Sequence, residues 1–120
     1  MAGIKRIAGV YRGRCRIVEH GGLIWTVATA PGETVAAQTR NTLAAIEANM
    51  IEAGTDKHHI LEATVYLTDL ATKPEMDAVW CDWIPDDGWP CRACVGADLF
   101  DDTLVEIKLT AAKPGRGKSP

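Results

Sequence analysis

The sequence predicts an α+β fold, in which one mixed β-sheet is covered on one face by two helices. Two segments with the apolar spacing of amphipathic helices, residues 33–53 and 72–83, alternate with segments rich in β-branched residues, which gives the order β-β-α-β-α-β-β. No internal repeat or linker interrupts the 120 residues, so we expect one domain over residues 1–112. Residues 113–120, KPGRGKSP, have the composition of a disordered polar tail.

The composition is that of a globular protein and argues against several classes of function. Hydrophobic residues make up 47% of the chain and charged residues 24%, which are values typical of folded domains. The 13 Lys and Arg against 16 Asp and Glu give a net charge of −3, which is not the basic balance of a nucleic-acid-binding protein. The sequence shows no signal-peptide core and no apolar run near the ~20 residues that span a bilayer. We therefore expect a cytoplasmic protein that binds neither nucleic acid nor membrane.

The first half of the chain predicts a hairpin followed by a helix. Residues 22–31, GLIWTVATAP, form a strand that ends at Pro31-Gly32, and residues 14–20 form its partner across a turn at His20-Gly21-Gly22. The helix that follows ends at Gly54, a residue suited to a C-terminal cap. Its predicted apolar stripe consists of Val35, Leu43, Ile46, Met50 and Ile51.

The second half predicts a strand, a helix and a second hairpin. In residues 61–67, LEATVYL, alternation places Ala63, Val65 and Leu67 on one face. The second helix starts near Thr72 and Pro74, and its apolar residues are Met76, Val79, Trp80 and Trp83. Two further strands, CRACVGADL and TLVEIKLTAA, flank the turn residues Asp101-Asp102, so they are expected to pair with each other.

The spacing Cys91-Arg92-Ala93-Cys94 resembles half of a zinc site or a redox dithiol. If this segment is a strand, however, Cys91 and Cys94 face opposite sides of the sheet. The sequence has no second cysteine pair at ligand spacing, and His58-His59 lies in a helix-to-strand connection without cysteine partners. We expect free thiols and no bound metal.

Arg92 and Glu106 are the candidate functional residues of the last two strands. An arginine among small and apolar residues needs an anion close to it. The alternatives for Arg92 are a surface position or an ion pair with an Asp or Glu of the same chain. Glu106 alternates with the core residues Val105 and Ile107, so its alternative role is that of a solvated strand carboxylate.

Several segments together resemble the reactive intermediate deaminase (Rid, or YjgF) family. In sequence order they are GLIWTVATAP, AAQTRNTLAAIEANMIEAG, ILEATVYLTDL, PCRACV and LVEIKLTAA, and they cover residues 14–112. The most specific pieces are the run TVYLTD at 64–69, Pro-x-Arg at 90–92 and Val-Glu-Ile at 105–107. The resemblance implies a chorismate-mutase-like fold and a homotrimer whose sites lie between subunits.

The resemblance also implies a reaction and roles for three residues. Arg92 would hold the substrate carboxylate, backbone groups of Cys94 would contact the substrate, and Glu106 would orient the attacking water. The substrate would be a 2-imino acid such as 2-iminopropanoate or its tautomer 2-aminoacrylate, hydrolysed to a 2-keto acid and ammonia. Because an imine carbon is already electrophilic, this hydrolysis of a C–N bond needs neither cofactor nor metal.

The sequence departs from the family pattern at the expected site. Val27-Ala28-Thr29 stands where the best-known members have Ser-Gly-Gln, and the family tyrosine falls at Arg14 unless the register shifts to Tyr11. We expect Val27 and the added bulk of Trp25 and Trp89 to bias the cleft toward larger or more apolar imines. The alternative for each tryptophan is ordinary core or interface packing.

The competing class of function is a trimeric module that binds or senses a small carboxylate without converting it. Members of the family are also described as ribonucleases, translation inhibitors or chaperone-like proteins, and the acidic balance of this chain argues against RNA.

Overall fold

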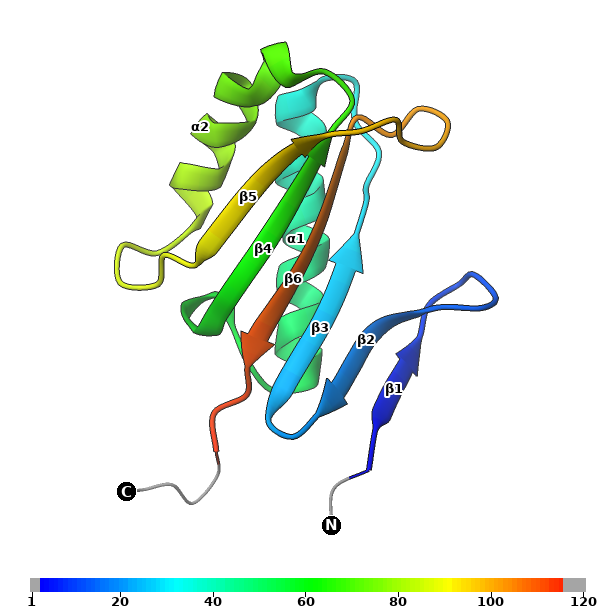
Figure 1. Cartoon of the computed structure of the whole chain (residues 1–120), viewed down its shortest axis with the longest axis vertical. Helices are drawn as coiled ribbons and strands as arrows, with labels where there is room; N and C mark the ends of the chain where they lie inside the picture. The colour runs from blue at the N-terminus through cyan, green and yellow to red at the C-terminus, as the bar shows by residue number, and fades with distance from the viewer. Residues whose placement is uncertain (1–2, 116–120) are drawn as a thin grey trace.

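The computed structural model describes residues 3–115 and contains one six-stranded mixed sheet in the order β1-β2-β3-β6-β4-β5 (Figure 1). Parallel pairing occurs between β4 and β5, whereas the other neighbouring strands are antiparallel. The strands are β1 (Lys5–Ala8), β2 (Cys15–His20), β3 (Leu23–Ala28), β4 (Ile60–Leu67), β5 (Cys91–Gly96) and β6 (Val105–Ala112).

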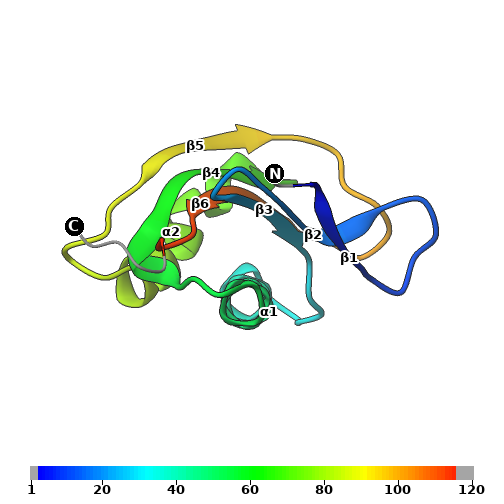
Figure 2. The same cartoon turned by 90° about the horizontal axis from the view of Figure 1, so that it is seen from below.

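Both helices, α1 (Val35–Ala53) and α2 (Lys73–Trp83), lie on the same side of this sheet, as Figure 2 shows. Local sequence explains where α1 begins and ends. The Thr34 hydroxyl accepts a hydrogen bond from the backbone N–H of Ala37, which caps the first turn. Gly54 has a φ of 92°, the left-handed conformation that favours glycine, and its N–H bonds back to α1 carbonyls. The predicted α+β architecture, one mixed sheet with both helices on one face, is confirmed.

The hydrophobic core lies between the helices and the sheet, where the predicted alternation is confirmed. Ala63, Val65 and Leu67 of β4 and Ile107 of β6 are buried there. The prediction for Ile51 was wrong, because its side chain is 63% exposed. Met50 already faces the sheet, and the next residue of an α-helix is rotated by about 100°.

The predicted hairpin between the last two strands was also wrong. β4 lies between β5 and β6, so these two strands are not neighbours. Residues 73–83 form the helix of a β4-α2-β5 crossover, and such a connection brings two strands together in parallel. The alternation within each strand identifies its faces but not its partner.

Two further segments bear on the predicted boundaries. β1 was not predicted, since only Ile7 of its four residues is partly buried and no apolar alternation marks it. In the predicted tail, Lys113 is held by its backbone N–H to the carbonyl of Gly22 at 2.8 Å and by its ammonium to Glu19 at 2.9 Å. Residues 116–120 lie outside the described residues, so the prediction for them stays a prediction.

Candidate functional site

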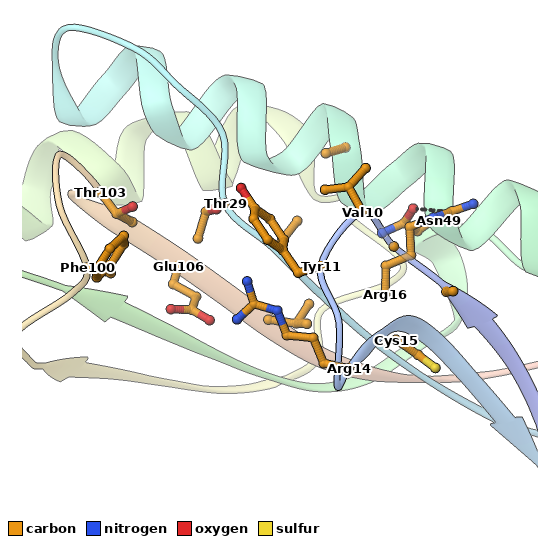
Figure 3. A pocket seen from close by; sticks show the side chains of 15 residues that line it. Val10, Tyr11, Arg14, Cys15, Arg16, Thr29, Asn49, Phe100, Thr103 and Glu106 are labelled. Atoms are coloured by element: carbon orange, nitrogen blue, oxygen red, sulfur yellow. Dashed lines mark hydrogen bonds between the residues drawn. The ribbon is translucent and has the colours of Figure 1, made fainter.

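A pocket of about 950 Å³ opens where the β1–β2 turn, the end of β3 and the loop before β6 approach one another (Figure 3). These three segments are far apart in the sequence, and α1 contributes Ala45 and Asn49 to the floor. The volume lies at the upper end of the range for small-molecule sites. The other lining residues are Ala8, Gly9, Val10, Tyr11, Arg14, Cys15, Arg16, Val27, Ala28, Thr29, Phe100, Thr103 and Glu106.

Three of the predicted site residues, Glu106, Val27 and Arg14, line this pocket together. Glu106 reaches it because its neighbours Val105 and Ile107 are fully buried on the helix side, so alternation turns Glu106 to the open face. Within residues 3–115 no hydrogen bond or ion pair engages the Glu106 carboxylate. The carboxylate is therefore available to a water molecule or a ligand in the pocket.

Arg14 and Tyr11, the two residues that could correspond to the family tyrosine, both line the pocket. The Arg14 guanidinium lies over the Tyr11 ring, with its central carbon 4.6 Å from the ring centroid. A cation over the face of an aromatic ring is attracted by the ring quadrupole. The stacking holds both side chains on one wall, where Arg14 projects toward the region of Glu106 (Figure 3).

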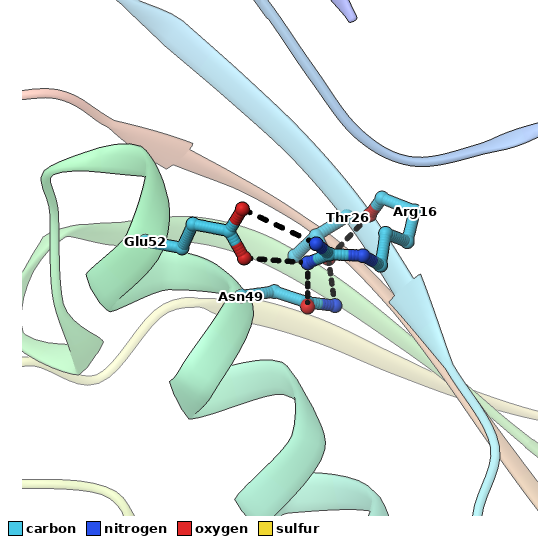
Figure 4. Close-up of polar contacts among 4 residues, drawn as sticks. All are labelled: Arg16, Thr26, Asn49 and Glu52. Atoms are coloured by element: carbon cyan, nitrogen blue, oxygen red, sulfur yellow. Dashed lines mark hydrogen bonds and ion pairs between the residues drawn. The ribbon is translucent and has the colours of Figure 1, made fainter. Parts of the chain in front are cut away.

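The turn that carries Tyr11 and Arg14 is tied to α1 by a polar network (Figure 4). Arg16 donates to Glu52 at 2.8 and 3.2 Å and to Asn49 at 2.9 Å. Asn49 donates to the hydroxyl of Thr26 at 3.0 Å, and that hydroxyl donates to the Arg16 carbonyl at 2.8 Å. The hydrogen bonds from Arg16 lower the pKa of the Glu52 carboxyl below its ordinary value. The network fixes β2 at the point where it leaves the pocket.

The opposite wall is tied to the same helix by Gln38, whose side chain is buried. Its amide nitrogen donates to the carbonyls of Gly32 and Asp102, at 3.1 and 2.9 Å. Its oxygen accepts from the backbone N–H groups of Leu104 and Val105, at 2.7 and 3.3 Å. One side chain therefore positions the loop that brings Phe100 and Thr103 to the pocket.

Arg92 and Cys94 lie elsewhere, on the helix side of β5. Arg92 donates to Asp77 of α2 at 2.6 Å and lies over the ring of Trp80, 5.1 Å from its centroid. Burial alone would raise the pKa of the Asp77 carboxyl. The hydrogen bonds from Lys73 and Arg92 outweigh this effect, so the pKa of Asp77 lies below its ordinary value. The chain thus contains the internal ion pair that was the alternative role for Arg92.

Arg92 and Glu106 of one chain do not converge. Arg92 of β5 is paired with Ala63 of β4, and Ala63 is paired with Leu109 of β6. Ala63 and Leu109 are buried on the helix side of the sheet. Glu106 lies two strands away and three residues along, on the other face. With strands about 4.8 Å apart and a rise of about 3.3 Å per residue, the offset is about 10 Å in each direction. A small acid cannot touch both side chains in the same chain.

The two predicted tryptophans lie outside the large pocket. Trp25 lines a smaller hollow of about 260 Å³ on the open face of the sheet, together with residues of β4 and β6. Trp89 lies just before β5 and is 75% exposed. Neither position bears on the shape of the cavity around Glu106 within one chain.

The cysteine pair takes the arrangement that strand alternation predicts. Cys91 aligns with Glu62 on the open face, whereas Cys94 aligns with the buried Val65 and packs against the core. Both are free thiols. Within residues 3–115 no three His, Cys, Asp or Glu side chains are grouped so that they could hold a metal ion.

Sequence reasoning missed several pocket residues, among them Asn49, Phe100 and Thr103. Asn49 lies in one of the segments that carry the family resemblance but was not singled out there, and Thr103 reaches the pocket only through the fold. Phe100 had a detectable signal, because it is the single phenylalanine of the chain and lies in the acidic turn DLFDD. Its side chain is 89% exposed at the rim. Thr29 contributes a hydroxyl in the segment where the family serine is replaced.

Comparison with known proteins agrees with this fold. Residues 19–113 match the family described as Endoribonuclease L-PSP. A YjgF family protein from Neisseria meningitidis has a TM-score of 0.88 and 37% identity, covering 95% of this chain and 98% of that one. A YjgF/YER057c/UK114 family member from Mycobacterium tuberculosis has a TM-score of 0.85 and 25% identity, covering 92% and 99%.

Curated relatives carry the name RutC family protein. A 76-residue stretch is 40% identical to the protein from Haemophilus ducreyi and covers 62% of this chain and 65% of that protein, just under two thirds of its length. YoaB from Escherichia coli K12 is also 40% identical over 76 residues, which are 67% of its length.

The sheet order and the two helices on one face define a chorismate-mutase-like protein with a pocket suited to a small molecule. The extent of the family match identifies it further: the chain belongs to the YjgF/Rid family, also described as Endoribonuclease L-PSP. In the described part of the chain no helix has the length and apolar character needed to cross a membrane.

Proposed function

We propose that this protein is an enamine/imine deaminase that hydrolyses 2-imino acids to 2-keto acids and ammonia. The observation that carries the proposal is Glu106, a carboxylate without a hydrogen-bonding partner in residues 3–115, which lines a pocket large enough for a small acid. The pocket also contains the hydroxyls of Thr29 and Thr103. These groups suit the activation of water next to a polar substrate.

In the proposed reaction, water adds to the carbon of the C=N bond while Glu106 accepts its proton. The nitrogen is protonated in turn, the C–N bond breaks, and ammonia leaves as the C=O bond forms. One water is consumed for each ammonia released, with no change in oxidation state. The step needs no cofactor, because the imine carbon is electrophilic and positioning supplies the rest.

Arg92 is proposed to hold the carboxylate next to the imine. Asp77 engages one terminal nitrogen of its guanidinium, and the five N–H donors of arginine leave others for a substrate. The same ion pair and the Trp80 ring fix the direction of the side chain. β5 is an edge strand of the sheet, so one side of its backbone is open and groups of Cys94 can contact the substrate.

Because Arg92 and Glu106 of one chain lie on opposite faces, a site that uses both must combine two copies. We propose a homotrimer in which Glu106 of one copy and Arg92 of the next face the same substrate, as the family resemblance implies. Light scattering at micromolar concentration should give the mass of three chains. A monomer at that concentration would leave Arg92 and Glu106 in separate sites.

The direct test of the proposed function is ammonia release from imino acids that an amino acid oxidase generates in the assay. The wild type should accelerate release above spontaneous hydrolysis, and Glu106→Gln should not. Lys108→Gln is the matched control, because Lys108 lies on the same strand and is exposed. If keto acids bind to the wild type but ammonia release stays at the spontaneous rate, the protein is the non-catalytic carboxylate-binding module instead.

A further inference from the structure

The guanidinium of Arg14 lies at the pocket without an acidic partner. No ion pair of the described residues includes Arg14, and its contact is the stacking on Tyr11. Arg16 and Arg92, in contrast, each have an acid of their own, Glu52 and Asp77. Of the arginines near the two parts of the proposed site, Arg14 is the one that forms no ion pair within residues 3–115, and its guanidinium projects toward the pocket region that contains Glu106 (Figure 3).

The chemistry of arginine indicates what would balance this charge. Its planar fork matches the two oxygens of a carboxylate, and hydrogen bonds between two charged groups are the strong ones. When a ligand fills the pocket and excludes water, an unpaired charge becomes costly. An anionic group of the ligand removes that cost, whereas an apolar group leaves it in place.

The backbone around Arg14 is placed by the fold, while its side chain is exposed on the surface of the turn. Gly13, with a φ of 92°, turns the chain just before it. Arg16, two residues later, is anchored to α1 through Glu52 and Asn49 (Figure 4). A guanidinium held in place by a stacked ring and an anchored strand is preorganised, which reduces the entropy lost on binding.

We infer that the ligand of this pocket is a dicarboxylic acid, in which Arg14 binds the side-chain carboxylate. The inference rests on the proposed function, which gives the carboxylate next to the imine to Arg92 of a neighbouring copy. The class is that of 2-imino and 2-keto acids with an acidic side chain, derived from acidic amino acids. Because Glu106 repels carboxylates, the side-chain carboxylate has to bind on the side of the Arg14 guanidinium that faces away from Glu106, and the imine carbon lies between the two residues.

This inference differs from the preference for larger apolar imines that the sequence suggested. Val27 lines the pocket within one chain, whereas Trp25 and Trp89, the bulky apolar residues of that argument, do not. The pocket wall that faces Glu106 is made of Tyr11 and Arg14 instead (Figure 3). A long apolar side chain on the ligand would have to lie against a charged guanidinium.

Calorimetric titration with three keto acids tests the inference: 2-ketoglutarate, 2-ketobutyrate and 4-methyl-2-oxopentanoate. The wild type should bind the diacid most tightly. Arg14→Gln should reduce the preference of the diacid over 2-ketobutyrate by about tenfold or more, the size expected for one charge-assisted hydrogen bond. Arg12→Gln is the matched control, since Arg12 lies in the same turn but does not line the pocket. It should retain the preference.

A wild type that binds the diacid no better than the monoacids would overturn the inference, as would an Arg14→Gln variant that keeps the preference. Ammonia release separates the inference from the proposed function. If 2-iminopropanoate is hydrolysed but no diacid preference exists, the function stands and the inference is wrong. If the diacid preference depends on Arg14 but no imine is hydrolysed, the role of Arg14 stands and the deaminase proposal is wrong. Arg14 is exposed and outside the core, so both variants are expected to fold.

Discussion

Arg92 and Arg14 lie in separate regions of the chain, and only Arg14 lines the large pocket; they also differ in what surrounds them. Arg92 is packed between β5 and α2, where Asp77 and Trp80 hold it. Arg14 lies on a surface turn, where it stacks on Tyr11 and has no acidic partner in the described chain. A single chain therefore provides one arginine that is held by an acidic residue and one arginine without an ion pair in the described residues, in separate regions of the fold. Both can serve one ligand only when two copies meet.

The largest expected effect is on the open face, at Glu106. Glu106→Gln keeps the shape of the side chain but removes the base, so turnover should fall by ~10²–10⁴-fold. Binding of 2-ketobutyrate should be retained, because the carboxylate is held elsewhere. Ammonia release and calorimetry on the same preparation check both expectations. Loss of keto acid binding together with unchanged turnover would contradict the assigned role.

The second largest effect is expected from replacing the planar guanidinium of Arg92. Arg92→Lys keeps the charge but cannot contact Asp77 and a substrate carboxylate with one rigid group. We expect kcat/KM to fall by about tenfold or more, mainly through KM, because one charge-assisted hydrogen bond is lost. Steady-state ammonia release over a range of imine concentrations measures kcat and KM separately. A fall in kcat alone, with KM unchanged, would argue that Arg92 acts in a later step.

Gln38 provides a test of the pocket wall formed by the loop before β6, which contains Phe100 and Thr103. Gln38→Leu leaves the N–H groups of Leu104 and Val105 without their acceptor, which should lower the free energy of unfolding by about 1–3 kcal/mol. Urea denaturation measures the change. Asn41→Ala is the control on the same helix, because Asn41 makes one exposed bond, to the Pro31 carbonyl. Equal losses in both variants would mean that Gln38 has no special role in holding the loop.

The dependence of stability on acidic pH measures the contribution of the ion pair between Asp77 and Arg92. The pKa of Asp77 is lowered in the fold, so its ionised form contributes stability above the ordinary pKa of 3.8 and loses it as the pH falls through the lower folded value. Asp77→Asn should therefore cost about 1 kcal/mol or less at pH 7. The difference from the wild type should shrink below pH 3.8. Unfolding curves between neutral and acidic pH would show a constant difference if the ion pair contributed nothing.

The smallest expected effect is at Cys91. Its thiol faces the open side, away from Cys94 and from the pocket residues, so Cys91→Ser should change the free energy of unfolding by no more than ~0.5 kcal/mol. Turnover should stay near that of the wild type. A large loss of activity, or zinc retained in stoichiometric amount through gel filtration, would reopen the possibility of a site at the cysteine pair.

The sequence was sufficient where local periodicity decides the structure. Alternation in β4 and β6 identified the buried residues Val65 and Ile107 and placed Glu106 on the open face. The capping residue Gly54 marked the end of α1. Each of these features depends on neighbours within a few residues of the chain.

Features that depend on distant segments could not be predicted in the same way. β5 has a regular strand pattern, but nothing in it specifies parallel pairing with β4 instead of a hairpin with β6. The presence of both Phe100 and Arg14 at one pocket depends on Gln38 and on the Arg16 network, which connect segments far apart in the sequence. The partner of Arg92 was foreseen only as some Asp or Glu, since no local rule selects Asp77.

The central claim is that one site uses Glu106 of one copy and Arg92 of the next, and subunit mixing tests it most directly. Arg92→Ala and Glu106→Gln should each be inactive alone. After the two variants are unfolded together in equal amounts and refolded, some interfaces pair an intact Glu106 with an intact Arg92. Random assembly of a symmetric trimer restores about one site in four, so ammonia release should recover to about a quarter of the wild-type rate. Mixed trimers that stay inactive, with assembly verified by light scattering, would contradict a site shared between copies.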